Sequence, residues 1–158
     1  MVAKKTKQIE VSKDFPYPIE LVWEAITNKE ALSQWFMETD FEPVVGKKFQ
    51  FRSKPMKGWR GYVDGEVLEV NPVTHLKFSW QGMPTHSISF VRYELLSISE
   101  NSTKVTAIHE GFDQTHGWLS GYILRGILKS GWKKMFNSLL PQVLENAASG
   151  KIGKAISK

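Results

Sequence analysis

The sequence contains no cysteine, which excludes disulfide bonds, thiolate chemistry and cysteine-ligated zinc for this chain. It also has no hydrophobic run of the roughly 18 to 20 residues that a membrane-spanning helix needs. The basic residues 1–5 are not followed by the apolar segment of a secretory signal peptide. We therefore expect a cytoplasmic protein that is stabilised by packing alone.

Several catalytic signatures are missing as well. Gly58 and Gly61 flank a turn that has no lysine-serine sequel and no following helix, so no phosphate-binding loop is predicted. No serine lies in a nucleophile elbow. The four histidines are His75, His86, His109 and His116, and no two of them have the spacing that would place them on one helix face. We therefore predict no metal, no cofactor and no catalytic residue.

The composition that remains is typical of one globular domain. The 158 residues are 41% hydrophobic and 23% charged, and a chain of this length buries roughly two-thirds of its surface on folding. The net charge of +5 is spread along the chain and does not by itself indicate a nucleic-acid partner. We expect one domain over residues 1–148 and a flexible basic tail over residues 149–158.

The periodicity of apolar residues changes along the chain. Ile9 and Val11 alternate with polar residues as in a half-buried strand. Residues 18–27 and 28–36 then show helical spacing, with Pro18 suited to the first helical position and Asn28 to a cap. Turn residues punctuate an antiparallel meander over residues 41–110.

Alternation in the meander assigns side chains to one face of the sheet. The predicted inner face carries these residues: Phe49, Phe51, Leu76, Phe78, Trp80, Val91, Tyr93, Leu95, Val105, Ala107 and His109. The residues between them, such as Lys77, Arg92 and Glu94, should face the other way. In residues 62–70, apolar side chains occur at both odd and even positions, so alternation does not predict which of them face inward.

Residues 118–148 show helical spacing, but in two phases. Leu119, Ile123, Leu124 and Ile127 form one stripe, and a second stripe begins at Trp132. If one regular helix continued from the second stripe back through residues 118–130, Arg125 would lie at the centre of the apolar face. We therefore predict an interruption near Ser130 and Gly131, and a bend at Pro141.

Six short segments, in this order, carry a family resemblance: PIELVWEAIT at 18–27, LSQWF at 32–36, EVNP at 69–72, LKFSW at 76–80, HEGF at 109–112 and GW at 131–132. Over about residues 9–146 the sequence resembles the START-like superfamily. Within it, the chain is most similar to the family of the C-terminal domain of the activator of the heat-shock-protein-ninety ATPase.

The resemblance implies an α+β helix-grip fold, in which a curved antiparallel sheet wraps a long C-terminal helix and two short helices follow the first strand. An apolar cavity often lies between sheet and helix in such folds. This chain departs from the pattern in the added helical segment 118–130, which would cover or fill that cavity. We also expect no counterpart of the second domain with which the eukaryotic co-chaperone contacts its chaperone, which makes the co-chaperone role less directly transferable.

The aromatic residues of the inner face suggest a ligand cavity. The candidate lining consists of Trp35, Phe78, Trp80, Tyr93, His109, Trp132 and Phe136. The alternative is that these rings fill a solid core. His109 is interpreted as a structural histidine with its hydrogen bonds satisfied, and contact with a ligand or acid–base chemistry are the other two readings.

Three functions follow in order of preference. The first is a non-catalytic binding module for a small hydrophobic or lipid-like molecule, and the second is a chaperone-interacting protein that modulates a heat-shock ATPase. The third is a cyclase- or hydrolase-like enzyme, for which only Tyr93 and His109 are plausible polar groups. The basic helix residues are interpreted as a solvated face and the WRGY segment at 59–62 as a turn, so no nucleic-acid partner is predicted.

Overall fold

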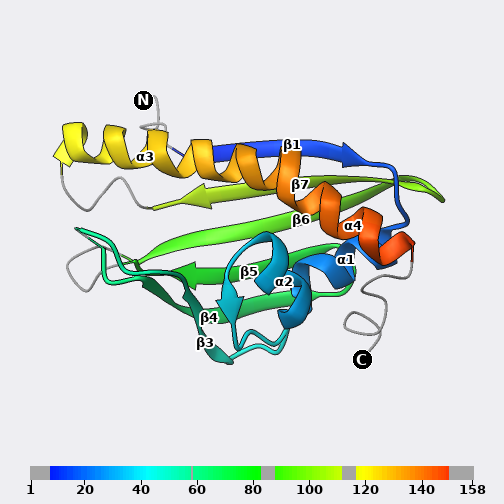
Figure 1. Ribbon diagram of the computed structural model, residues 1–158, viewed down its shortest axis with the longest axis horizontal. Coiled ribbons are helices and arrows are strands. Elements are labelled where there is room, and N and C mark those ends of the chain that lie inside the picture. The colour runs from blue at the N-terminus through cyan, green and yellow to red at the C-terminus, as the bar shows by residue number, and fades with distance from the viewer. Residues whose placement is uncertain (1–7, 58, 83–87, 112–116, 150–158) are drawn as a thin grey trace, which may run out of the picture.

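A computed structural model describes residues 8–57, 59–82, 88–111 and 117–149, with the backbone alone for residues 117–125. A seven-stranded antiparallel sheet, in the order β1-β7-β6-β5-β4-β3-β2, curves around one long helix (Figure 1). The strands are β1 (Ile9–Phe15), β2 (Glu38–Thr39), β3 (Lys48–Arg52), β4 (Tyr62–Asn71), β5 (His75–Trp80), β6 (Ser89–Ser99) and β7 (Ser102–Glu110). This arrangement confirms the predicted α+β helix-grip fold.

The inner face of the sheet is the predicted one. The aromatic and aliphatic side chains of β3, β5, β6 and β7 that alternation assigned inward are buried, except that Trp80 is half-buried. In β4, where no face was predicted, Val63 and Val67 are buried and a bulge follows Val67. Gly65 lies between them because the Phe49 ring is 2.5 Å from the position that a Cβ would occupy. The two-residue strand β2 was not predicted.

Two short helices follow the first strand, as predicted, and they cover one end of the sheet. They are α1 (Ile19–Thr27) and α2 (Lys29–Trp35). The Asn28 side chain accepts hydrogen bonds from the backbone N–H groups of Glu30 and Ala31, at 3.0 and 3.1 Å, and so caps α2. Pro18 is the N-cap of α1 and not its first helical residue.

The C-terminal helix has three parts, α3 (Gly117–Lys134), one π-helical turn η2 (Met135–Leu139) and α4 (Leu140–Ala148). The predicted interruption near Ser130 and Gly131 is wrong, because α3 continues through both residues. The phase argument placed Ile127 on the core stripe, but Ile127 is 64% exposed and Leu128 packs on the core instead. The other residues of the first stripe have side chains outside the described part of the chain.

The irregularity lies four residues further on and has a packing reason. Trp132, Phe136, Leu140 and Leu144 are all buried and recur every four residues, and each such step overshoots a full α-helical turn by about 40°. The wider π-helical turn of η2 takes up this overshoot. The helix axis changes direction where α4 begins, close to Pro141 (Figure 1). The predicted basic tail falls almost wholly in residues 150–158, outside the described residues.

Candidate ligand-binding site

The seven predicted cavity residues come from six elements that face one another. Trp35 lies on α2, Phe78 and Trp80 on β5, Tyr93 on β6, His109 on β7, Trp132 on α3 and Phe136 on η2. All are buried except Trp80. The structure therefore brings all seven into the layer between sheet and helix. That they line a ligand cavity stays a prediction.

The rings of this layer form one network, in which Phe136 meets Trp132 at 6.2 Å and Phe78 meets Tyr93 at 5.9 Å. We distinguish two groups within it. Trp35 and Phe136 lie near each other, with ring centroids 6.4 Å apart, and Phe136 also contacts Phe15 at 5.9 Å. We call the region around these three rings, under α1, α2 and α4, the closed end. The second group is the contact chain Trp80–His109–Trp132–Tyr93, with centroid distances of 5.2, 6.4 and 5.8 Å. We call the region around these four rings the open end.

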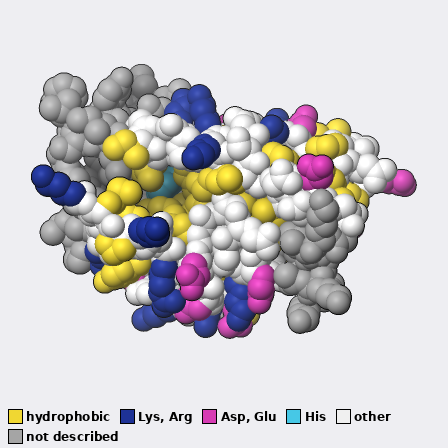
Figure 2. All heavy atoms as spheres, viewed as in Figure 1, with side chains coloured by type: hydrophobic (Ala, Val, Ile, Leu, Met, Phe, Trp, Pro, Cys, Tyr) yellow, Lys and Arg dark blue, Asp and Glu magenta, His cyan; other side chains and the backbone are white. Residues whose placement is uncertain are grey.

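The open end is hollowed at the surface. Figure 2 shows a depression with hydrophobic side chains around it and a histidine at its bottom. The described histidines are His75 and His109, and His75 pairs with Glu69 on the outer face of the sheet. The histidine at the bottom of the depression is therefore His109.

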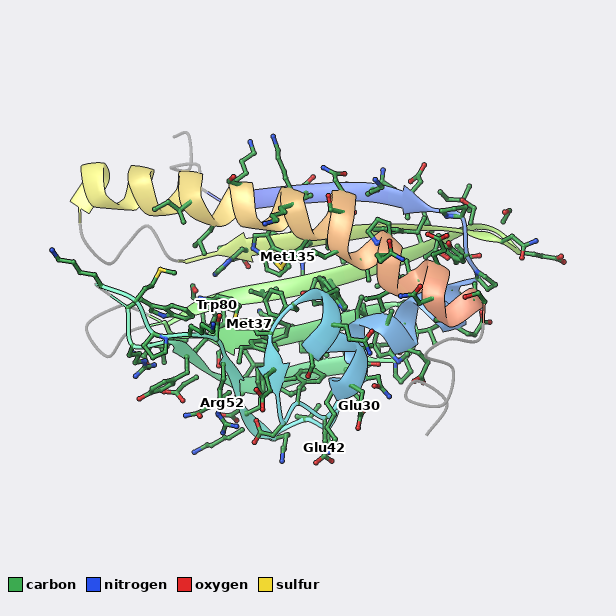
Figure 3. The ribbon with its side chains drawn as sticks, viewed as in Figure 1. Glu30, Met37, Glu42, Arg52, Trp80 and Met135 are labelled. Carbon is green, nitrogen blue, oxygen red and sulfur yellow. The ribbon has the colours of Figure 1, made fainter. Side chains whose placement is uncertain are left out.

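Three side chains around the hollow were not among the predicted lining residues. Phe36 stacks on Trp132 at 5.4 Å and meets Trp80 at 5.9 Å. Figure 3 shows Met37 and Met135 approaching the same space as Trp80, and both are half-buried against the core. Met135 follows Trp132 by three residues, a spacing that puts both on one helix face; Met37 lies outside any regular element and left no such signal.

The polar groups of the open end form one directional chain of hydrogen bonds. The Trp132 Nε1–H donates to Nδ1 of His109 at 3.5 Å, so the proton of the neutral imidazole is on Nε2. Nε2 lies 2.8 Å from Oγ of Ser89 and donates to it, and Ser89 Oγ–H donates to the backbone oxygen of Trp80 at 3.1 Å. Both nitrogens of His109 are thus engaged, as expected for a structural histidine.

Burial keeps this histidine neutral. His109 is 1% exposed, and burial lowers its pKa to about 3. The neighbouring Glu110 pairs with Arg92 at 3.5 Å on the outer face, as predicted, so it supplies no partner for His109. A group with this pKa does not exchange protons near neutral pH, which argues against a role as general acid or base.

One polar atom of the open end is left over. Tyr93 is 1% exposed, and its hydroxyl is the one buried side-chain oxygen or nitrogen without a hydrogen-bond partner among the described residues. Burial raises the pKa of this phenol, so it stays protonated. Strand alternation predicted that Tyr93 faces inward. It could not predict that the hydroxyl would lack a hydrogen-bond partner.

Other candidate chemistries find little support in the described residues. No three His, Asp or Glu side chains gather there in a way that would hold a metal ion. In the WRGY segment, Arg60 pairs with Asp64 at 3.0 Å and stacks over the Tyr62 ring at 4.0 Å. Gly61 has φ +92°, and a Cβ there would lie 2.8 Å from Pro55. These contacts explain the segment as the tight turn that the sequence analysis favoured.

The helices of the described chain are all too short or too polar to cross a membrane.

The profile of the family described as Activator of Hsp90 ATPase homolog 1-like protein matches residues 16–145. The chain belongs to this family. Family membership agrees with the START-like resemblance drawn from the six segments. No curated protein sequence matches the chain.

Solved structures share the fold of this family member. Protein MLL2253 from Mesorhizobium loti is 27% identical, with a TM-score of 0.74 over 88% of this chain and 97% of that one. Protein BH1534 from Bacillus halodurans is 26% identical, with a TM-score of 0.71 over 89% and 99%. An HSP90 activator from Plasmodium falciparum, PFC0360w, is 19% identical, with a TM-score of 0.60 over 90% and 94%, which shows a shared fold.

Proposed function

We propose that this protein is a non-catalytic binding module that takes a small hydrophobic or lipid-like molecule into its open end. The observation that carries the proposal is the apolar hollow above His109. Figure 3 places half-buried Met37, Trp80 and Met135 at this end of the layer, and Phe36 meets Trp80 at 5.9 Å. Ligand sites are typically concave and apolar, with few polar groups. The open end has this composition.

The hydrogen-bond chain supports an apolar occupant. The hydrogen bonds that link Trp132, His109, Ser89 and the Trp80 backbone occupy the polar atoms of these side chains. No water is needed to complete their hydrogen bonding. The described apolar side chains near the hollow, those of Phe36, Met37, Trp80 and Met135, offer aromatic carbon, sulfur and an indole ring. An apolar molecule that covers them gains about 25 cal/mol for each square ångström of apolar surface removed from water.

A fluorescence titration with N-phenyl-1-naphthylamine, a neutral naphthalene probe, tests this proposal. We expect saturable binding with about one probe per chain. Met135→Trp, which places a larger side chain at the border of the hollow, and Tyr93→Trp, which narrows the space behind it, should each weaken binding about tenfold. Tyr62→Trp is the matched control, because Tyr62 lies on the other face and stacks with Arg60.

Retained near-ultraviolet dichroism must accompany every titration, since a molten state also binds apolar probes. Absence of saturable binding by a native-like protein would remove the proposal. Equal weakening by Tyr62→Trp and Met135→Trp would place the binding site elsewhere.

The second candidate is modulation of a heat-shock ATPase, and family membership is what favours it. Its test is the ATP hydrolysis rate of the host's own Hsp90 with increasing amounts of this protein, together with retention of Hsp90 on the immobilised protein. A concentration-dependent rise with retention supports this role. No retention and an unchanged rate count against it.

An enzymatic role has the least support. Of the two polar groups that it would use, His109 is neutral and bonded through both ring nitrogens, and Tyr93 remains protonated. Neither group is poised for proton transfer near neutral pH. We expect the protein to act in the cytoplasm, an expectation that rests on the sequence alone.

A further inference from the structure

The hydroxyl of Tyr93 is placed where phenylalanine would serve packing equally well. Tyr93 lies in the middle of β6, paired with Leu76 of β5 and Ala107 of β7, which are both apolar. Its ring meets Phe78 at 5.9 Å and Trp132 at 5.8 Å. A buried hydroxyl without a partner destabilises a folded protein, so its presence calls for a functional explanation.

The polar groups nearest to this hydroxyl are already committed. The Trp132 indole donates to His109, and the Ser89 hydroxyl donates to the backbone of Trp80. Among the described residues, the Tyr93 hydroxyl is therefore the fully buried polar group of the open end that is left to contact a ligand. Because it keeps its proton, it acts as a hydrogen-bond donor.

The surroundings of the hydroxyl select against charged ligands. The buried residues of the described chain include no Asp, Glu, Lys or Arg. An anionic or cationic ligand group placed here would lose its hydration and gain no opposite charge. The site instead suits a neutral group with an oxygen that accepts one hydrogen bond.

Access to the hydroxyl runs past Trp132. This indole contacts both His109, at the bottom of the hollow, and Tyr93 behind it. Its hydrogen bond to His109 is 3.5 Å long, at the outer limit for such a bond. Trp132 also packs against Phe36 and Phe136, at 5.4 and 6.2 Å, so a ligand that reaches Tyr93 has to displace this indole and replace its ring contacts.

We propose that the Tyr93 hydroxyl donates a hydrogen bond to a carbonyl-type oxygen of the ligand, and that this protein selects neutral, largely apolar molecules bearing such an oxygen. This inference rests on the proposed binding function and specifies its ligand class. Tyr93 then determines which apolar molecules bind, while the surrounding rings supply most of the affinity.

An isosteric pair of neutral probes tests the inference. 2-Acetylnaphthalene and 2-isopropylnaphthalene have nearly the same shape, but only the ketone carries an acceptor oxygen. We expect the wild-type protein to bind the ketone about five- to tenfold more tightly, in competition with N-phenyl-1-naphthylamine. In Tyr93→Phe this preference should disappear, while the dissociation constant of the hydrocarbon stays within about twofold.

Tyr62→Phe is the matched control and should keep the wild-type preference, because Tyr62 lies on the other face of the sheet. Thermal unfolding and near-ultraviolet dichroism verify that each variant is folded. If both naphthalenes bind wild type equally, or Tyr93→Phe keeps the preference, the inference is overturned and the proposed function stands. If neither naphthalene binds saturably, the proposed function itself fails.

Discussion

The closed end and the open end each contain a buried tryptophan, and the two indoles are held differently. At the closed end, Trp35 Nε1–H donates to the backbone oxygen of Ala25 at 2.7 Å. At the open end, Trp132 Nε1–H donates to a side chain, His109, at 3.5 Å. The indole of the closed end is thus held by a short bond to a helix backbone, and the indole of the open end by a longer bond to another side chain. The open end is where we propose that a ligand binds.

The largest expected effect comes from removing either tryptophan. Trp35→Ala and Trp132→Ala should each lower the free energy of unfolding by about 3 to 5 kcal/mol, because each leaves a cavity that its neighbours fill only partly. Urea denaturation measures both losses. A loss below about 1 kcal/mol for Trp132→Ala would place this residue outside the core and contradict the packing of the open end.

Acidification should destabilise the protein through His109, which lies at the open end. The pKa of His109 is lowered to about 3 in the folded protein, against about 6.5 in the unfolded chain. Between these values the unfolded state binds the additional proton, so the stability from neutral His109 is present above pH 6.5 and is lost as pH falls. For this one group the free energy of unfolding should drop by about 2 kcal/mol between pH 7 and pH 5.

Denaturation at several pH values measures this slope. His109→Gln should flatten it, whereas Tyr62→Phe, on the outer face of the sheet, is the control and should keep the wild-type slope. An unchanged slope in His109→Gln would mean that His109 is not held neutral by burial.

A smaller effect is expected for Tyr93→Phe. Removing a buried hydroxyl that has no partner should raise the free energy of unfolding by about 1 kcal/mol in the absence of ligand. Thermal unfolding of the variant and of Tyr62→Phe makes the comparison. A clear destabilisation specific to Tyr93→Phe would show that the hydroxyl is hydrogen-bonded in the free protein.

The smallest effect concerns the helix between the two ends. Gly131 lies inside α3, and a Cβ there would meet no atom within 4 Å. Gly131→Ala should therefore stabilise the protein by up to about 1 kcal/mol, as in an ordinary helix interior. A neutral or destabilising result, measured by urea denaturation, would restore the interruption at Ser130 and Gly131 that the sequence pattern indicated.

The sequence predicted the fold well because strand alternation is a local signal. Phe49, Phe51 and Tyr93 could be assigned inward from their neighbours alone, and Asn28 from its position before a helix. The phase of α3 was misjudged because Ile127, although apolar, is exposed. A π-helical turn leaves only a repeat of four residues as its trace, which is easily read as ordinary helix.

The candidate site was predictable in its rings and not in its polar groups. All seven aromatic and histidine positions lie between sheet and helix, since each belongs to an inward stripe. Ser89 enters the site through a bond to His109 that joins residues twenty positions apart. Such pairings depend on the register of β6 against β7, which no single strand encodes.

The most direct test of the difference between the two ends is a nuclear magnetic resonance titration of the tryptophan side chains. Each indole N–H gives its own signal, and N-phenyl-1-naphthylamine is added until saturation. We expect the Trp132 and Trp80 signals to shift strongly, while the Trp35 signal, held by Ala25 at the closed end, stays in place. A Trp35 shift as large as that of Trp132, or no shift of Trp132 at saturation, would contradict the assignment of binding to the open end.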